Sequence, residues 1–181
     1  MSENTNFQLD YYRMTGEKWS FSPKTLVNML MHHNLRFMRL WRSYQRRKSP
    51  ITRLRIVRMC RKYGLEISVG AEIGEGFYIG HPYNITVAEG VRIGRNVNLH
   101  KGCTIGRENR GKRQGVPTIG NNVYVGINAV IVGNITVGDD VLIAPNSFVN
   151  QDIPPHTVVT GNPAILHPKE DATKDYVCFR V

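Results

Sequence analysis

The 181-residue sequence has few cysteines, no long apolar run and, over one stretch, no acidic residue. Its three cysteines, Cys60, Cys103 and Cys178, are scattered, which excludes a disulfide framework and a paired zinc knuckle. No apolar run approaches the roughly 18 residues of a membrane-spanning helix, and the polar N-terminus lacks the apolar segment of a signal peptide. Hydrophobic residues make up 41% of the chain, enough for a core. We therefore expect a cytoplasmic globular protein.

The missing acidic residues explain the high net charge. The formal charge is +10, and between residues 36 and 62 there are 11 basic residues and no acidic one. They are Arg36, Arg39, Arg42, Arg46, Arg47, Lys48, Arg53, Arg55, Arg58, Arg61 and Lys62. The rest of the chain is close to neutral. The charge thus belongs to one segment, and it says more about a partner of that segment than about the whole protein.

A six-residue period dominates the sequence from residue 67 onward. An aliphatic residue recurs at every sixth position, and the residue after it is usually Gly or Ala. The aliphatic positions are Ile67, Ile73, Ile79, Val87, Ile93, Leu99, Ile105, Ile119, Val125, Ile131, Val137, Ile143 and Val149. Neither a helix nor a strand meander has this period. It predicts an all-β solenoid of short parallel strands, in which three hexapeptides form one coil and the aliphatic side chains point inward.

The period breaks twice, and breaks in a solenoid are where functional insertions are expected. The eight residues from Ile79 to Val87 predict a bulge at 81–84, and the fourteen from Ile105 to Ile119 predict a polar loop at 107–117. Stacking of the coils places the Leu99 hexapeptide over the Ile79 hexapeptide. His81 and His100 are therefore predicted to be neighbours at one edge of the solenoid, outside the core.

This pattern resembles the left-handed parallel β-helix of the hexapeptide-repeat acyltransferases, over residues 67–166. The segment from Gly64 to His81 is similar to the stretch of serine O-acetyltransferases that ends in the catalytic histidine. The resemblance implies that His81 is a general base, and that Glu66 takes the place of the family's orienting aspartate. A carboxylate behind a neutral imidazole fixes its tautomer and stabilises the imidazolium ion. We include His100 as a further catalytic residue, which would bind the acceptor hydroxyl or carry a proton.

Two departures from the serine enzymes bear on the acceptor. Gly80 stands where those enzymes have an aspartate, and Gly115-Val116 stands before Pro117 where they have an Arg-His pair before a proline. The pattern around His81 and His100 looks more like the branch that acetylates sugars of capsule, exopolysaccharide or O-antigen. We therefore expect transfer of an acetyl group to a saccharide hydroxyl. Serine O-acetyltransferase and a sugar N-acetyltransferase stay open as alternatives, and a non-catalytic β-helix assembly module represents a different class.

The resemblance also implies acetyl-CoA as acyl donor, bound in a groove between the prisms of a homotrimer. The predicted contacts to acetyl-CoA are Gly126, Ala144 and Thr160, and the predicted contacts to the acceptor are Tyr83, Asn84, Arg110 and Lys112. No metal is expected, because the spaced histidine pair of β-helical carbonic anhydrases is absent. Cys103 falls at an inward small position, which indicates packing and not chemistry.

The organisation predicted from the sequence is a basic helical arm at 1–64, a β-helix at 65–166 and a tail at 167–181. Pro23 and the pair Ser49-Pro50 can start helices, and Gly64 can end the second one. One helical face collects Leu26, Leu30, Phe37, Leu40, Trp41 and Tyr44, with Arg36, Arg39, Arg42 and Arg46 away from it, and Ile51, Leu54 and Val57 give the second helix an apolar stripe.

Two interpretations of the arm remain open. Its apolar faces would pack on the first coil or on another subunit, leaving the arginines in solvent. Alternatively, the cationic face would touch anionic lipid at the inner face of the membrane, where lipid-linked sugars are assembled. Nucleic acid is not expected as a partner, because the aromatic residues fall on the presumed packing face.

Overall fold

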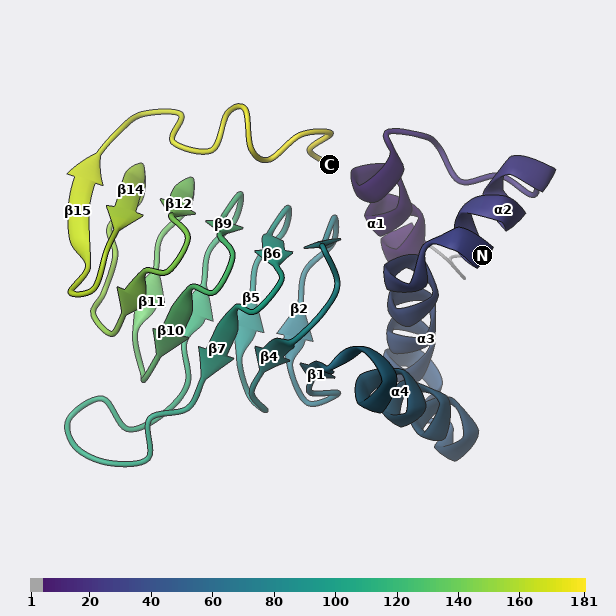
Figure 1. Cartoon of the computed structure of the whole chain (residues 1–181), viewed down its shortest axis with the longest axis horizontal. Coiled ribbons are helices and arrows are strands. Elements are labelled where there is room, and N and C mark those ends of the chain that lie inside the picture. The colour runs from purple at the N-terminus through teal and green to yellow at the C-terminus, as the bar shows by residue number, and fades with distance from the viewer. Residues whose placement is uncertain (1–4) are drawn as a thin grey trace.

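The structure, a computed structural model, describes residues 5–181 as a helical arm at one end of a three-sided parallel solenoid (Figure 1). The helices are α1 (Thr5–Thr15), α2 (Pro23–Met31), α3 (His33–Arg47) and α4 (Pro50–Tyr63). The strands of the first half are β1 (Leu65–Ile67), β2 (Glu72–Ile73), β3 (Tyr78–Gly80), β4 (Ile85–Val87), β5 (Arg92–Ile93), β6 (Asn98–His100) and β7 (Thr104–Gly106). Those of the second half are β8 (Thr118–Ile119), β9 (Tyr124–Val125), β10 (Val130–Val132), β11 (Thr136–Val137), β12 (Val141–Ile143), β13 (Phe148–Val149), β14 (Thr157–Thr160) and β15 (Ile165–Pro168).

Three sheets form the walls of the solenoid, and successive strands of the chain pass from one wall to the next. The sheet orders are β1-β4-β7-β10-β13, β11-β8-β5-β2 and β15-β14-β12-β9-β6-β3. Within these sheets, all strand pairings are parallel except that of β14 with β15. The period-six aliphatic residues pair with one another, for example Ile79 with Leu99 and Leu99 with Val125. All thirteen predicted inward positions are buried, which confirms the solenoid and its three-hexapeptide coil.

Both predicted interruptions leave the walls. The residues between β3 and β4 form the 81–84 corner, and residues 107–117 form a loop whose base is closed by an antiparallel bridge between Glu108 and Gly115. In Figure 1 this loop projects from the lower edge of the solenoid.

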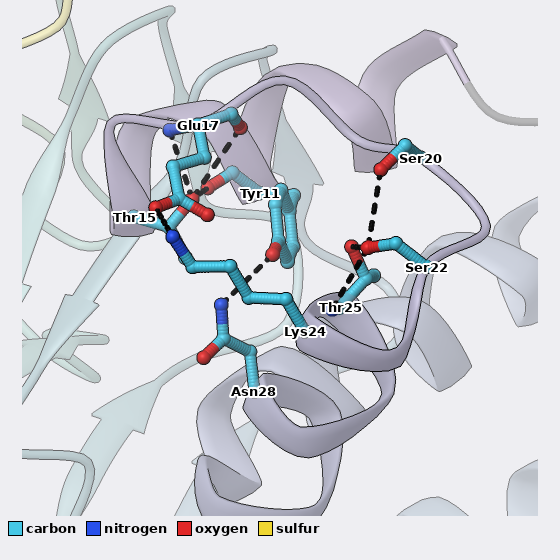
Figure 2. Close-up of polar contacts among 8 residues, drawn as sticks. All are labelled: Tyr11, Thr15, Glu17, Ser20, Ser22, Lys24, Thr25 and Asn28. Carbon is cyan, nitrogen blue, oxygen red and sulfur yellow. Dashed lines mark hydrogen bonds and ion pairs between the residues drawn. The ribbon is translucent and has the colours of Figure 1, made fainter.

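Local capping signals explain where the helices begin and end. The side chain of Ser22 accepts a hydrogen bond from Thr25 N at the start of α2, and that of Ser49 accepts one from Thr52 N at the start of α4. Gly64 ends α4 with a φ of 66°, in the left-handed region that favours glycine. Helix α1 lies within the predicted arm of residues 1–64 but precedes Pro23, the first helix start that the sequence indicated. Figure 2 shows how its end is joined to α2, with Asn28 donating to Tyr11 and Lys24 paired with Glu17.

The arm is attached to the first coil by a buried ion pair, which corrects one expectation. Arg42 was expected in solvent, but its side chain is buried and donates to both carboxylate oxygens of Asp10, at 2.8 and 3.0 Å. The same guanidinium donates to the carbonyl oxygens of Ile73 and Gly74, and Asp10 accepts from Phe77 N. Carbonyl groups at the open end of the solenoid thereby gain donors from α3.

The predicted apolar faces of the arm also differ from those in the structure. His32 separates α2 from α3, so Leu26 and Leu30 do not share the buried face that contains Phe37 and Trp41, and they are exposed. The predicted stripe of α4 is also wrong in part, because Ile51 and Leu54 are exposed while Ile56 is the buried residue of that helix. An apolar surface therefore remains on the outer side of the arm.

The C-terminal tail runs back along the solenoid from β15 to the helices (Figure 1). Asp140 holds its middle by accepting hydrogen bonds from Ala172 N, Thr173 N and the Thr173 hydroxyl. Its end is fixed by two hydrogen bonds between Asn96 and the backbone of Val181. None of the helices in the described part of the chain has the length and apolar character that crossing a bilayer requires.

Candidate functional site

The 81–84 corner carries the first predicted catalytic residue in an exposed position. His81 has a left-handed φ of 48° and its side chain is exposed, because the two extra residues of the bulge carry it out of the wall. Two side chains of helix α3 contact the backbone of this corner. Asn34 donates to Ile79 O at 3.0 Å, and a ring nitrogen of His33 lies 3.1 Å from Pro82 O.

His100 lies on the next coil, packed among other rings. Its ring centroid is 6.3 Å from that of His81 and 4.7 Å from that of Tyr124, as the stacking argument predicted. A Cβ on Gly80 would lie 2.5 Å from His100 Cε1, so the ring takes the room that a side chain at position 80 would need. The aspartate of the serine enzymes therefore cannot stand there with His100 in this position.

Burial gives His100 an unusual protonation behaviour. Burial and the neighbouring His81 lower the pKa of His100 to about 4, so its ring is neutral at pH 7. Its Nε2 is buried and has no hydrogen-bond partner among the described residues. The two histidines thus differ in kind, since the His81 side chain is open to a substrate while the polar edge of His100 is enclosed.

The predicted acetyl-CoA contacts lie in line with His100. Because Leu99, Val125, Ile143 and Val159 pair in register, the residues that follow them share one edge of the solenoid. These following residues are His100, Gly126, Ala144 and Thr160. Gly126 is tightly covered, since a Cβ there would lie 2.7 Å from Pro145 N. Gly126 is buried, Ala144 and Thr160 are half-buried, and the Thr160 hydroxyl contacts His167 Nε2 at 3.0 Å.

Glu66 is exposed on β1, where it pairs with Thr86 on the strand that follows the 81–84 corner. No hydrogen bond joins its side chain to that of His81 within residues 5–181.

The other acceptor residues fall into two groups. Tyr83 and Asn84 follow His81 in the same corner, and both are exposed. Arg110 and Lys112 are in the projecting loop, where with Arg113 they line a pocket of about 350 Å³ against Phe148 and Asn150. Within one chain, the structure therefore brings His81, Tyr83 and Asn84 together and places the basic loop residues in a pocket of their own.

An aromatic cluster beside the corner is not evident from the sequence. The rings of His33 and Tyr63 are stacked with centroids 3.8 Å apart, and the Tyr83 ring meets His33 at 5.0 Å. Its members come from α3, α4 and the corner, and the repeat pattern contains no signal for the two helical ones. Such a cluster offers an apolar surface with polar tips next to His81.

Two other kinds of chemistry receive no support here. Cys103 is fully buried, and burial raises the pKa of its thiol to about 12, which suits the predicted packing role. In the described residues, no group of three or more His, Cys, Asp or Glu side chains is placed to hold a metal ion.

Comparison with known proteins connects this geometry to a family. The family model described as bacterial transferase hexapeptide (six repeats) matches residues 117–151, inside the solenoid. The structure superposes on soybean serine acetyltransferase with a TM-score of 0.71 and 26% identity, covering 90% of this chain and 66% of that one. The solenoid of this chain is thus similar to those of the hexapeptide-repeat transferases. Its coil is accordingly the left-handed β-helix that the resemblance implied.

Two curated relatives of this chain carry the same name. Serine acetyltransferase of Helicobacter pylori is 39% identical over 112 residues, which cover 62% of this chain and 63% of the relative. Serine acetyltransferase of Staphylococcus xylosus is 38% identical over 123 residues, covering 66% of this chain and 56% of the relative. The chain thus spans less than two thirds of the length of these curated relatives. The capsule branch finds no support in them, and the serine alternative is favoured over the saccharide prediction.

Proposed function

We propose that the protein transfers an acetyl group from acetyl-CoA to a hydroxyl group of a small acceptor. The observation that carries the proposal is His81, an exposed histidine at a bulged corner of a hexapeptide β-helix, directly after the Gly80 that pairs with His100. In the proposed reaction, His81 takes the hydroxyl proton as the acceptor oxygen attacks the thioester carbonyl. The tetrahedral intermediate then expels the CoA thiolate, which receives that proton from the imidazolium ion.

The remaining predicted residues support this step in different ways. Glu66 orients the His81 ring when the acceptor is bound, from its place on β1. His100 acts as a positioning residue, since its neutral ring leaves the His81 imidazolium without a second positive charge nearby. Gly126, Ala144 and Thr160 line the edge along which the pantetheine arm would bind to backbone groups.

Serine is the acceptor that the names of the relatives support. A saccharide hydroxyl is the second candidate, and specific features of this chain favour it. Gly80 and Val116 replace charged residues of the serine enzymes, and the cluster of His33, Tyr63 and Tyr83 offers a surface on which the apolar face of a sugar ring stacks.

The assembly we propose is a homotrimer in the cytoplasm, where acetyl-CoA is available. The 107–117 loop would reach a neighbouring prism, so that Arg110 and Lys112 contact the acceptor or the phosphates of acetyl-CoA there. The pocket there is lined by three basic residues and one acidic residue, Glu108, so its formal charge is positive and suits an anionic group. In the competing class, a non-catalytic assembly module, these residues would have no ligand.

The test measures thiol release from acetyl-CoA by the purified protein, with serine, free sugars and nucleotide sugars as acceptors. His81→Asn is expected to lower kcat by about 10²–10⁴, the usual contribution of general-base catalysis. Asparagine tolerates the left-handed backbone of this corner, so the fold is retained. His156→Asn is the matched control, because His156 is also exposed and has a φ of 54°.

The outcomes separate the possibilities. Loss of turnover in His81→Asn alone supports the mechanism, and equal turnover in both variants overturns it. The acceptor with the highest kcat/KM decides between serine and a saccharide. Absence of thiol release with every acceptor favours the assembly module.

A further inference from the structure

The outer side of the arm contains a groove that the proposed reaction does not use. It has a volume of about 550 Å³ and is formed by α2, α3 and α4. Apolar side chains of Met29, Leu40 and Met59 line it, and arginines from α3 and α4 stand beside them. Met29 is buried, whereas Leu40 and Met59 are half-buried, so the apolar lining is accessible from outside.

The arginines of the groove have no acidic partner. Arg36 donates to Leu30 O at 2.7 Å, and Arg39 lies over the Trp19 ring at 5.9 Å. Arg55 is exposed, and none of the three forms an ion pair in the part of the chain that the structure describes. With no acidic residue between 36 and 62, their charge is uncompensated. An anionic group is therefore the complement of this site.

Exposed apolar side chains also occur on and beside the helices that form the groove. Phe21 is 94% exposed and Leu30 is 62% exposed, at the two ends of α2. Leu26, Val27 and Met31 of α2 and Ile51 and Leu54 of α4 are exposed as well. Seven of the large exposed apolar residues thus belong to the arm, six of them on α2 and α4 and Phe21 just before α2. Exposure of this much apolar surface marks an interaction site.

The position of the arm leaves this surface accessible. Helix α4 contacts β1 and α1 contacts β3, so the arm covers one end of the solenoid (Figure 1). Its outer side points away from the coils, and binding there does not require the solenoid edge that carries His100 and Gly126.

We propose that this surface binds an anionic phospholipid membrane. Arg36, Arg39 and Arg55 would hold lipid phosphates at the groove, while Phe21, Leu26 and Leu30 enter the acyl boundary. Basic residues together with exposed Phe and Leu side chains are the combination found in helices that lie in a membrane interface. A symmetric second copy would bring arginine against arginine without a carboxylate between them. RNA would satisfy the arginines and leave the apolar side chains in water.

The experiment is co-sedimentation of the full chain with vesicles of phosphatidylcholine alone or of an equal mixture with phosphatidylglycerol. We expect binding only to the mixed vesicles. The variant Arg39→Gln with Arg55→Gln should bind about 30-fold more weakly, the factor given by about 1 kcal/mol per basic residue. Arg95→Gln with Lys174→Gln is the control, since it removes the same charge from exposed positions on the solenoid and tail.

A second variant tests the apolar part. Leu26→Ser with Leu30→Ser should weaken binding even at low salt, whereas a purely electrostatic attachment would be unchanged. Circular dichroism and thermal unfolding establish that each variant is folded. Equal loss in the groove and control variants would overturn the proposal, as would absence of binding to mixed vesicles. A change of molecular mass in the groove variants, without vesicle binding, would assign the surface to a second copy instead.

Discussion

At the scale of single residues, the two histidines show how packing separates similar side chains. His81 extends from a bulged corner into solvent, while the ring of His100 occupies the room above Gly80. Their rings are 6.3 Å apart, and the neighbouring His81 contributes, after burial, to the lowered pKa of His100. The two side chains therefore differ in accessibility, and only His100 is held neutral by its surroundings.

The lowered pKa of His100 predicts a pH-dependent stability. Burial and His81 lower that pKa to about 4 in the folded chain, against 6.5 for a free histidine. Between these values the unfolded chain binds more protons, so the free energy of unfolding falls as the pH drops from about 6.5 toward about 4. Between about pH 7 and about pH 5 the free energy of unfolding is expected to fall by about 1–2 kcal/mol, because a shift of one pKa unit corresponds to about 1.4 kcal/mol.

The measurement is urea unfolding of wild type and His100→Gln at both pH values. Other titrating groups cancel in the comparison, so wild type should lose more stability on acidification than the variant. Identical losses in the two proteins would show that His100 is not held neutral by its surroundings.

At the scale of elements, the arm and the solenoid meet through polar groups as well as apolar ones. Burial raises the pKa of Asp10, and the Arg42 guanidinium and Phe77 N–H oppose that rise by bonding the carboxylate. Nearby, Arg13 donates to Gly76 O at 3.0 Å and to the side chain of Asn98. The first coil therefore depends on α1 and α3 for its hydrogen bonds.

Asp10→Asn should consequently destabilise the junction. Removing one partner of a buried ion pair leaves an uncompensated charge, here on Arg42, and costs about 3–5 kcal/mol. Chemical denaturation measures the loss, and limited proteolysis should release the arm before the solenoid is cut. Lys24→Met breaks the exposed pair with Glu17 and is the control, from which little change is expected. Equal behaviour of the two variants would mean that the buried pair does not hold the arm.

At the scale of the whole molecule, the tail connects the last coils to the first helix. Tyr176 packs on Tyr124 with ring centroids 5.0 Å apart, and its carbonyl accepts a hydrogen bond from Asn98. The ring of Phe179 meets Tyr12 of α1 at 5.8 Å. The tail thereby encloses the face of the solenoid on which Tyr124 and His100 lie.

Asp140→Asn should loosen this tail. Burial raises the pKa of Asp140, but hydrogen bonds from Thr173, His156 and Ala172 hold it below its usual value. An amide replaces one accepting oxygen by a donor, so at least one charge-assisted bond is lost, at about 1.5–3 kcal/mol. Amide hydrogen exchange should accelerate over residues 170–181. In Glu170→Gln, which changes only an exposed partner of His156, the exchange should stay as in wild type; acceleration in both or neither would contradict the assignment.

The sequence alone determined the solenoid, because a period of six cannot be met by any other regular backbone. It also located the corner at His81, the proximity of His100, the helix starts at Pro23 and Ser49-Pro50 and the helix end at Gly64, since these follow from local spacing and capping. Only the tertiary structure decided which arm side chains are buried. Arg42 forms hydrogen bonds with Asp10 and with two carbonyl groups that are 31 or more positions away in the sequence. Leu26 and Leu30 are exposed because α2 and α3 are separate helices with a break at His32. The aromatic cluster at His33 and the groove beside Arg55 likewise arise where separate elements meet. The six-residue period predicts the local structure that is repeated in each coil. Contacts between distant segments depend instead on how the elements pack.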